Sequence, residues 1–454
     1  MTVRLKRLLA DWRDRDTHRR VWALAAPMIV SNITVPLVAL TDSTVAGHLS
    51  HASQLAAVTV GNTIYQLPVL VCGFLRMGTV GFSAQACGRG DGNALRRILV
   101  QALLLALVLA TTIGLLLVPF LHPVLALMKP SSSLLDQATG FVHVRFLGLP
   151  AALANYALAG WFLGSQNARV TVQILVLTNL VNIGLNLVFV LGLGWGIHGI
   201  ALASALGEWS GCLFGLSRIH AQLRAYPGRL LGRRLTLWAE WKPLLAVNRD
   251  ILIRSVALQG VFFAVVTLGA RMGDAVVAAN ALLLNGLMLA AFALDGLANA
   301  VEALTGHAIG SRQHDQLRRA IVVAGGWSLV GSVLFALLFG LFGRVFVDMQ
   351  TSIDSVRSTA DVYLPCLAVL PLVAFLSYFL DGLFIGATRA REMRDAMLIA
   401  GGAFTISVLL LRPLGNLGLW LALLLFMLVR GGVMAWMGQG ITRRDEWITP
   451  QRAT

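Results

Sequence analysis

An aspartate lies near the end of the first long apolar stretch of the chain. That stretch runs from Val21 to Leu40, and TDSTVAGHL, which contains Asp42, follows it. A carboxylate in hydrocarbon costs about 2.5–3.5 kcal/mol, and burial disfavours its charged form. Asp42 could therefore hold a proton in apolar surroundings, and once ionised it would require water, a cation or a hydrogen-bond donor nearby. We predict a proton-coupling site; the alternative is an aspartate that serves structure through neighbouring hydroxyl groups.

A proline precedes this acid in the same apolar stretch. Pro36 lies about one and a half helical turns before Asp42. Proline removes a backbone hydrogen bond, so a helix can bend there. We predict that bending at Pro36 couples protonation of Asp42 to the shape of the helix.

Other acids also interrupt apolar stretches. In FALDGLANAVEAL, Asp295 and Glu302 are seven residues apart and thus on one helical stripe. Exposing such acids to lipid costs free energy, so they should line a cavity or pair with a cation. Arg76 and Arg254 are the candidate cations. A structural salt bridge is the alternative for Glu302. Asp381, near the inner end of its helix, is predicted to be either a gate or loop-anchoring residue or a site acid of the C-lobe, and Arg76 shares the gate assignment.

Amide side chains supply a second polar group. TNLVNIGLN places Asn182 and Asn186 four residues apart on one helical face, with Asn179 close by. Together with Ser204 they are expected to line the substrate cavity; asparagine that joins helices is the alternative. Glu208 receives no assignment.

The helices that position these residues follow from the composition. Hydrophobic residues make up 57% and charged residues 13% of the 454 residues, and the mean hydropathy is +0.76. Soluble domains carry about 25% charged residues, and a membrane helix needs about 20 apolar ones. We predict an all-α polytopic membrane protein with twelve transmembrane helices, over 22–46, 55–82, 98–121, 138–163, 170–193, 198–220, 246–270, 276–305, 319–343, 359–385, 394–411 and 417–438.

The net charge of +15 at pH 7 has a membrane explanation. Most Lys and Arg residues fall in segments on the same side as the basic N-terminus, which is the asymmetry that marks the cytoplasmic side. We therefore predict cytoplasmic termini, contact with the lipid bilayer and no nucleic-acid partner.

The sequence contains an internal duplication. GWFLGSQNAR (160–169) resembles GLFIGATRAR (382–391), and the same offset of 222 residues aligns Arg96 and Arg97 with Arg318 and Arg319. Six spans per half give parallel repeats, an architecture of secondary transporters with the substrate path between the lobes.

The duplication predicts the domain organisation. A basic N-terminal segment (1–20) precedes an N-lobe (21–222), a cytoplasmic linker (223–245), a C-lobe (246–440) and a cytoplasmic tail (441–454). The sequence has no Walker lysine motif and no histidine cluster, so we expect no cofactor, no metal site and no enzymatic activity.

Several stretches resemble a known family. APMIVSNITVPLVALTDSTVAGHL, AAVTVGN and SAQACGRGD resemble the start of a multidrug and toxic compound extrusion (MATE) transporter. ALDGLANAVEALTGHAIG and DGLFIGATRAREMRDAM resemble its DNA-damage-inducible protein F (DinF) branch, and the likeness covers roughly residues 20–440. The resemblance implies two six-helix lobes around a central cavity and cation-coupled export of amphipathic, often cationic compounds.

The resemblance also assigns residues. It implies that Asp42 is the protonation site and that Asn182 matches a family asparagine. Asn186 stands where some members carry aspartate, and the seventh span lacks the glutamate of the sodium-coupled branch. We therefore predict a monomeric, proton-coupled multidrug antiporter of the bacterial inner membrane. The alternatives are a sodium-coupled antiporter of the same family and a flippase for lipid-like amphipathic molecules.

Overall fold

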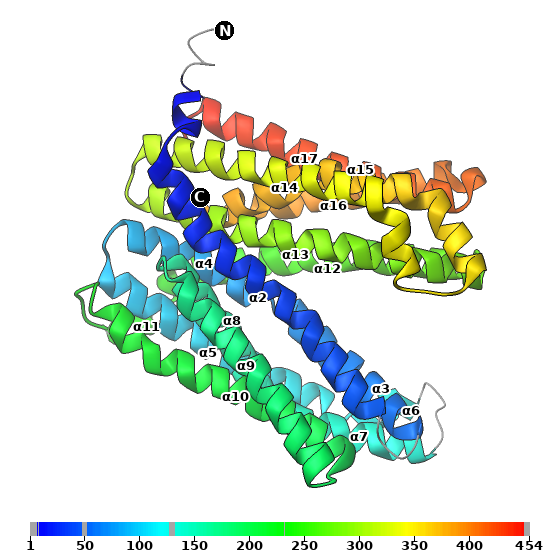
Figure 1. The fold of residues 1–454 in the computed structure, drawn as a ribbon. Coiled ribbons are helices and arrows are strands. Elements are labelled where there is room, and N and C mark those ends of the chain that lie inside the picture. The colour runs from blue at the N-terminus through cyan, green and yellow to red at the C-terminus, as the bar shows by residue number, and fades with distance from the viewer. Residues whose placement is uncertain (1–6, 8, 48–51, 127–131, 231, 449–454) are drawn as a thin grey trace. The chain divides into compact units, whose positions relative to one another are not determined.

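The computed structural model describes residues 7, 9–47, 52–126, 132–230 and 232–448. Side chains are described outside 33–47, 52, 124, 132, 133 and 233. The described residues form helices and connecting turns without a strand, which confirms the predicted all-α class. The chain divides into two compact units (Figure 1). The first unit is Val30–Leu244, and the second unit is Leu245–Thr454 together with Met1–Ile29.

The helices of the first unit follow one another through short turns. Its elements are most of α2 (Arg15–Gly47), α3 (Ala52–Val71), α4 (Phe74–Gly88), α5 (Gly92–Leu117), α6 (Leu121–Ala126), α7 (Ser132–Phe146), α8 (Leu149–Gly164), α9 (Ala168–Asn186), a π-helical stretch (Leu187–Gly192), α10 (Gly196–Leu223) and α11 (Gly232–Leu235). The fully buried Trp161 anchors a core among α5, α8, α9 and α10. Its indole N–H donates to the Leu95 carbonyl at 2.9 Å, so this large side chain is also fixed in orientation.

The second unit contains longer helices. They are α12 (Trp238–Ala270), which begins in the predicted linker, α13 (Asp274–Gly310), α14 (His314–Asp348), α15 (Asp354–Gly386), α16 (Ala390–Leu410), a 3-10 turn (Arg412–Leu414) and α17 (Asn416–Arg443). Figure 1 shows these helices running side by side within the unit. Leu283, Leu367, Trp420 and Phe426 lie at the centre of their shared apolar core.

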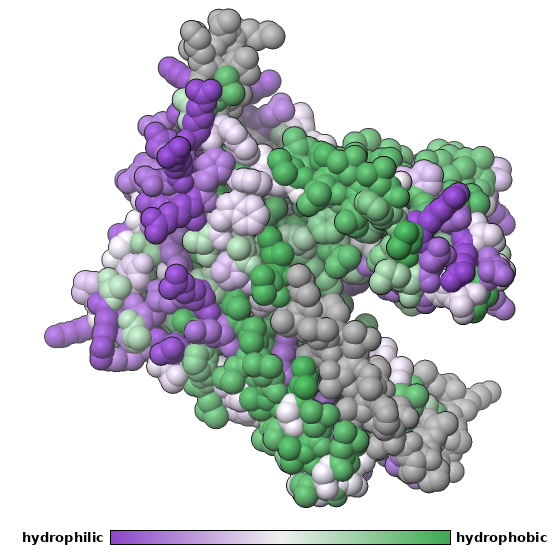
Figure 2. Space-filling model, in the orientation of Figure 1, coloured by the Kyte–Doolittle hydropathy of each residue, from purple (hydrophilic) through white to green (hydrophobic). Residues whose placement is uncertain are grey.

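The outer faces of the helices suit a lipid bilayer. Large apolar side chains such as Leu115, Phe263 and Leu341 are at least 70% exposed, and Figure 2 shows apolar residues on the visible helix faces and hydrophilic ones at helix ends. Within the described residues, ten helices are long and apolar enough to cross a membrane, and α7 with α8 forms one further bent span. The first predicted span, 22–46, lies in α2, whose later side chains are outside the described set. A polytopic membrane fold is thus confirmed.

The duplication reappears in helix packing. A Cβ atom at Gly160 would lie 2.4 Å from the Arg76 carbonyl oxygen, and one at Gly382 would lie 2.6 Å from that of Ala298. Both pairs are related by the same offset of 222 residues. The equivalent glycines Gly164 and Gly386 make the next such approach, one turn later. Each half therefore brings two helix backbones together at the same two positions.

The turns after these helices repeat as well. Gln166 has a φ of 64° and its counterpart Thr388 a φ of 56°, both in the left-handed region. Gly90 and Arg312 form a second such pair, with φ of 68° and 57°. Non-glycine residues rarely adopt this conformation. Its recurrence in both halves indicates that the turn geometry was kept while the side chains changed.

One span is broken in the first unit but continuous in the second. The predicted fourth span, 138–163, is broken in the structure: α7 and α8 meet at an angle of 44° around Leu147 and Gly148. The equivalent residues of the second unit lie in one uninterrupted helix, α15. A break leaves carbonyl and amide groups without helical partners, so the first unit must satisfy them in another way.

The glycine contacts predict the effect of adding one methyl group. Gly164→Ala would place Cβ 2.6 Å from the Val80 carbonyl oxygen, and Gly386→Ala would place it 2.5 Å from that of Glu302. We expect each change to destabilise the protein by about 1–3 kcal/mol through overpacking. The measurement is thermal unfolding of the purified protein in detergent.

Gly432→Ala is the matched control for this prediction. It is also in a helix, but no atom lies within 4 Å of the added Cβ. Better helix propensity should leave its stability unchanged or raise it by up to about 1 kcal/mol. Equal unfolding temperatures for all three variants would contradict the close helix approach.

Candidate functional site

Two of the predicted site residues lie in α2. The helix continues through Pro36 and Asp42 to Gly47, so both belong to one helix as expected. Their side chains lie outside the described residues. The roles of Asp42 in proton coupling and of Pro36 in bending therefore stay predictions.

Three polar residues of the first unit form a hydrogen-bonded group, which we call the amide chain: Asn182, Asn186 and Ser204. The Asn182 amide donates to the Ser204 hydroxyl at 2.7 Å, and the Asn186 amide donates to the Asn182 oxygen at 3.3 Å. All three side chains are buried. Gly207 brings α10 close to Asn182, since a Cβ there would lie 3.1 Å from the Asn182 Cβ. Asn179 lies half-buried on α9.

The amide chain lies beside an irregular piece of helix. Asn186 is the last α-helical residue of α9, and Leu187–Gly192 continues as a π-helix. π-Helical turns are rare and are often found at functional sites. The sequence contains no proline or glycine signal for this stretch before Gly192, so the irregularity was not predicted.

A second buried group surrounds Glu208, the acid left unassigned from the sequence. We call Tyr65, Arg145 and Glu208 the Glu208 cluster. Arg145 pairs with the carboxylate at 2.9 Å, and the Tyr65 hydroxyl donates to it at 2.9 Å. The Arg145 guanidinium also stacks 3.9 Å from the centre of the Tyr65 ring. Three helices, α3, α7 and α10, thus share one neutralised ion pair.

The Glu208 cluster secures the broken helix on both sides of its break. Arg145 is in the last turn of α7, and a Cβ on Gly148, before α8, would lie 2.1 Å from a Glu208 carboxylate oxygen. A cation at a helix C-terminus and an anion at an N-terminus both suit the helix dipole. In addition, Trp209 donates to the Leu147 carbonyl at 2.9 Å, and Asn155 donates to the Glu208 carbonyl at 2.8 Å.

The second unit contains a buried carboxylate between two arginines. Asp381 pairs with Arg254 from α12 and with Arg430 from α17, and all three residues are at most 7% exposed. We call them the Asp381 cluster. Asp295 on α13 is close enough to Arg430 to interact with it electrostatically. Arg254 was considered as a counter-charge from the sequence, whereas Arg430, in the middle of α17, was not assigned a role.

The other predicted polar residues, Glu302, Asp295 and Arg76, are not members of the groups defined above. Glu302 is 2% exposed in the tightly packed part of α13, where its carbonyl meets Gly386. Asp295, two turns earlier, is half-buried. Arg76 lies in α4 of the first unit, where it interacts electrostatically with Tyr156.

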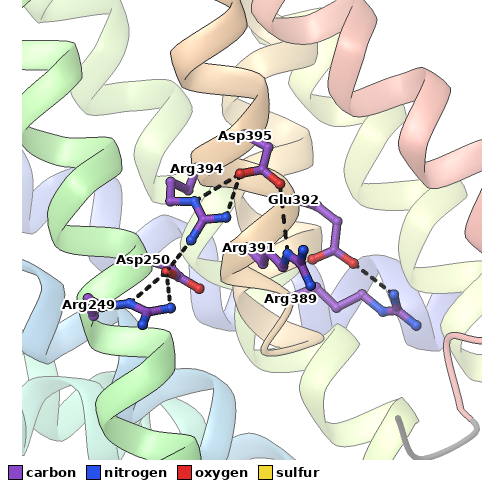
Figure 3. Close-up of polar contacts among 7 residues, drawn as sticks. All are labelled: Arg249, Asp250, Arg389, Arg391, Glu392, Arg394 and Asp395. Atoms are coloured by element: carbon purple, nitrogen blue, oxygen red, sulfur yellow. Dashed lines mark hydrogen bonds and ion pairs between the residues drawn. The ribbon is translucent and has the colours of Figure 1, made fainter. Parts of the chain in front are cut away.

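A further ion-pair network links α12 and α16 (Figure 3). Asp250 of α12 accepts hydrogen bonds from Arg249 at 2.9 Å and from Arg394 of α16 at 2.8 Å. Arg394 also pairs with Asp395 at 2.7 Å. Asp250 is four residues before Arg254, so one face of α12 carries an acid paired to α16 and a base paired to α15. These contacts fix this part of α12 within the second unit.

The Glu208 cluster predicts a strong non-additive effect of mutation. Arg145→Met would leave the Glu208 carboxylate, whose side chain is only 12% exposed, without its counter-charge, which should destabilise the protein by about 3–5 kcal/mol. Arg145→Met combined with Glu208→Gln removes both charges and should recover most of that stability. Unfolding temperatures of the purified variants provide the measurement.

An exposed ion pair is the control for this double-mutant cycle. Arg344 and Asp361 lie 3.4 Å apart, and the Arg344 side chain is 79% exposed. Arg344→Met should cost only about 0–1 kcal/mol. If the double variant at Arg145 and Glu208 is as unstable as the single one, the buried charge is not the cause.

Comparison with known proteins identifies the family. The MatE family model matches residues 27–188 and 251–412, one match in each half. DNA damage-inducible protein F of Escherichia coli K12 is 42% identical over 435 residues, covering 95% of this chain and 94% of its own. A probable multidrug resistance protein NorM of Xanthomonas axonopodis pv. citri is 28% identical over 84% of this chain and 83% of its own.

Solved structures show the same fold. A crystal structure of MATE in the bent conformation aligns with a TM-score of 0.86 at 20% identity, covering 98% of this chain and 99% of that one. A second, in the straight conformation, aligns with a TM-score of 0.84 over 95% and 97%. With the family model matching both halves and a relative matching nearly end to end, the resemblance predicted from the sequence is confirmed, and the chain belongs to the MatE family of multi-pass membrane transporters.

Proposed function

We propose that this transporter exports amphipathic, often cationic organic compounds from the bacterial cytoplasm in exchange for protons. Relatives named as multidrug resistance proteins support the substrate class. The distribution of basic residues supports an inner-membrane protein with cytoplasmic termini. A monomer is consistent with the internal duplication, because one chain contains both repeats between which the substrate path is expected.

The Asp381 cluster is the observation that supports protons over sodium. A bound sodium ion needs carboxylate or carbonyl oxygens that are free of fixed cations. At Asp381, two guanidinium groups already pair with the carboxylate. A further cation would be repelled by both at short range, and this repulsion is strong where the effective dielectric constant is low. A cation site built on Asp381 is therefore disfavoured.

Asp42, the acid that follows the apolar stretch of α2, remains for the coupling role. Protonated, it is neutral and compatible with apolar surroundings; ionised, it favours water or a cationic substrate. The amide chain offers neutral donors and acceptors in the same unit, which would bind a polar group without titrating. Each proton that enters the cell releases about 2.3 kcal/mol of free energy per 100 mV of membrane potential, in addition to the contribution of the pH gradient. Competition between proton and substrate would then give exchange.

The first test replaces the coupling acid. Asp42→Asn is neutral like the protonated aspartate, so folding should be preserved while proton-driven export falls to background. Dye uptake into inside-out vesicles, which corresponds to export from the cytoplasm, measures this after normalisation to protein content and unfolding temperature. Asp348→Asn is the matched control, because Asp348 is an exposed acid at the end of α14. Full activity of Asp42→Asn would rule out the proposed role.

The second test separates the coupling ions. Purified protein in liposomes is given either a pH gradient or a sodium gradient, each without the other. We expect substrate movement only with the pH gradient, and collapse of that gradient by an ionophore should stop it. Export that follows the sodium gradient would favour the sodium-coupled alternative, and movement of lipid-like substrates without either gradient would favour a flippase.

A further inference from the structure

The start of the chain is docked on α14 of the second unit. We call residues 9–20 the N-terminal segment. Asp11 is 4% exposed and accepts hydrogen bonds from Arg318 at 2.7 and 3.2 Å. The Trp12 ring lies against Gly326, where a Cβ atom would lie 2.2 Å from the ring. Glycine at position 326 is therefore required for this contact, and the docking is specific rather than a loose association of charges.

His18 contacts α14 through one ring nitrogen and the N-terminal segment itself through the other. The indole N–H of Trp327 donates to His18 Nδ1 at 2.9 Å. His18 Nε2 lies 2.5 Å from the Trp12 carbonyl oxygen. Indole nitrogen is only a donor and a carbonyl oxygen only an acceptor. Nδ1 must therefore be without a proton, and Nε2 must carry one, so this contact exists only with neutral histidine.

Protonation would place two donors face to face. In the imidazolium form Nδ1 carries a proton that points at the Trp327 N–H, so one hydrogen bond is replaced by repulsion. Histidine is the side chain whose charge ordinarily changes between about pH 5 and 8. The aromatic cluster around the ring would lose its polar link, since Trp12 and Trp327 contact His18 edge to face at 4.9 and 6.0 Å between centroids.

The surrounding charges are already engaged with one another. Asp11 pairs with Arg318 and with Arg319, and Asp14 pairs with Arg319. A hydrogen bond from Thr17, together with Arg319, lowers the pKa of Asp14, which therefore stays ionised. The other charged or titratable groups on the elements packed here are Arg13, Arg15, Asp16, Arg19 and Arg20 of the segment, His314 and Asp315 of α14, and His307 of α13, which interacts with Arg20. The ion pairs given above do not involve His18, whose ring makes the two hydrogen bonds to Trp327 and Trp12.

The docked segment leads directly into the helix that carries the coupling acid. His18 is in the first turn of α2, which continues without interruption to Gly47 and includes Asp42. Residues up to Ile29 belong to the second unit, and from Val30 the same helix belongs to the first. Whatever holds His18 therefore fixes the start of α2 within the second unit.

We propose that His18 is a proton-responsive positioning residue for transport. When His18 is neutral, it holds the start of α2 on α14. When His18 is protonated, this contact is lost, so α2 no longer has a fixed end against which it bends near Asp42. This inference rests on the proposed proton exchange and on a cytoplasmic N-terminus. Protons delivered by transport would then slow further exchange when the cytoplasm becomes acidic, which gives a built-in limit to the acid load.

Spin-label distances in the full-length protein test the contact without requiring transport. Labels on Arg13→Cys and Val330→Cys report the separation of the segment from α14, and the four native cysteines are buried. In liposomes we expect one short distance at about pH 8 and a second, longer population at about pH 5.5. Their ratio should change by roughly fivefold or more, as expected for the loss of one hydrogen bond.

Variants of His18 give opposite expected results. His18→Gln keeps a neutral donor and acceptor and should retain the short distance at both pH values. His18→Arg is permanently charged and should show the longer distance at both. Trp22→Phe is the matched control, because Trp22 packs on Trp327 with 5.0 Å between centroids and should keep the wild-type response. A pH response in His18→Gln equal to that of wild type, or a short distance in His18→Arg held by its aromatic neighbours, would overturn the proposal.

Transport measurements then connect the contact to function. Acidifying only the cytoplasmic side at constant driving force should lower the maximal rate of the wild type by at least roughly threefold, with little change in KM, and His18→Gln should lack this fall. If the transport rates of the wild type and of His18→Gln depended on cytoplasmic pH in the same way, the proposal would also be overturned. The distance change should persist in Asp42→Asn, so a failure of proton coupling and a failure of the His18 contact give different results.

Discussion

Charge inside an apolar helix bundle has to be compensated by the protein, because lipid offers neither water nor counter-ions. In the first unit, Glu208 is neutralised by Arg145 and further bonded by Tyr65. In the second unit, Asp381 lies between Arg254 and Arg430. Each of these clusters joins three helices, so charge compensation and helix packing are the same contacts.

The two clusters show how the duplicated halves diverged. Glu208 and Arg430 occupy equivalent positions in the 222-residue repeat, yet one is an acid and the other a base. Their partners come from different places: Arg145 lies at the break between α7 and α8, whereas Asp381 lies in the continuous α15. The glycine approaches at Gly160 and Gly382 were kept, which indicates that backbone proximity is constrained more tightly than the sign of the buried charge.

Apolar length and periodicity sufficed to predict the helices, and the repeat was visible from short motifs because glycine and arginine recur at fixed spacing. The sequence also indicated Asn182, Asn186 and Ser204, which the structure joins by hydrogen bonds. Contacts between residues distant in the chain were not predictable in this way. Arg254 and Asp381 are 127 residues apart, and nothing local to Glu208 indicates Arg145 as its partner. The break at Gly148 was missed because apolar residues continue across it.

The docking of Asp11 on Arg318 joins residues separated by 307 positions, and this has a consequence for biogenesis. A ribosome that adds about 5–20 residues per second needs roughly 15–60 s to reach the partner. During that interval Asp11 and Trp12 have no binding surface, and the whole first unit is synthesised before that surface exists. The N-terminal residues, which are synthesised first, are therefore among the last to dock. The second unit is completed by residues that were synthesised before the rest of it.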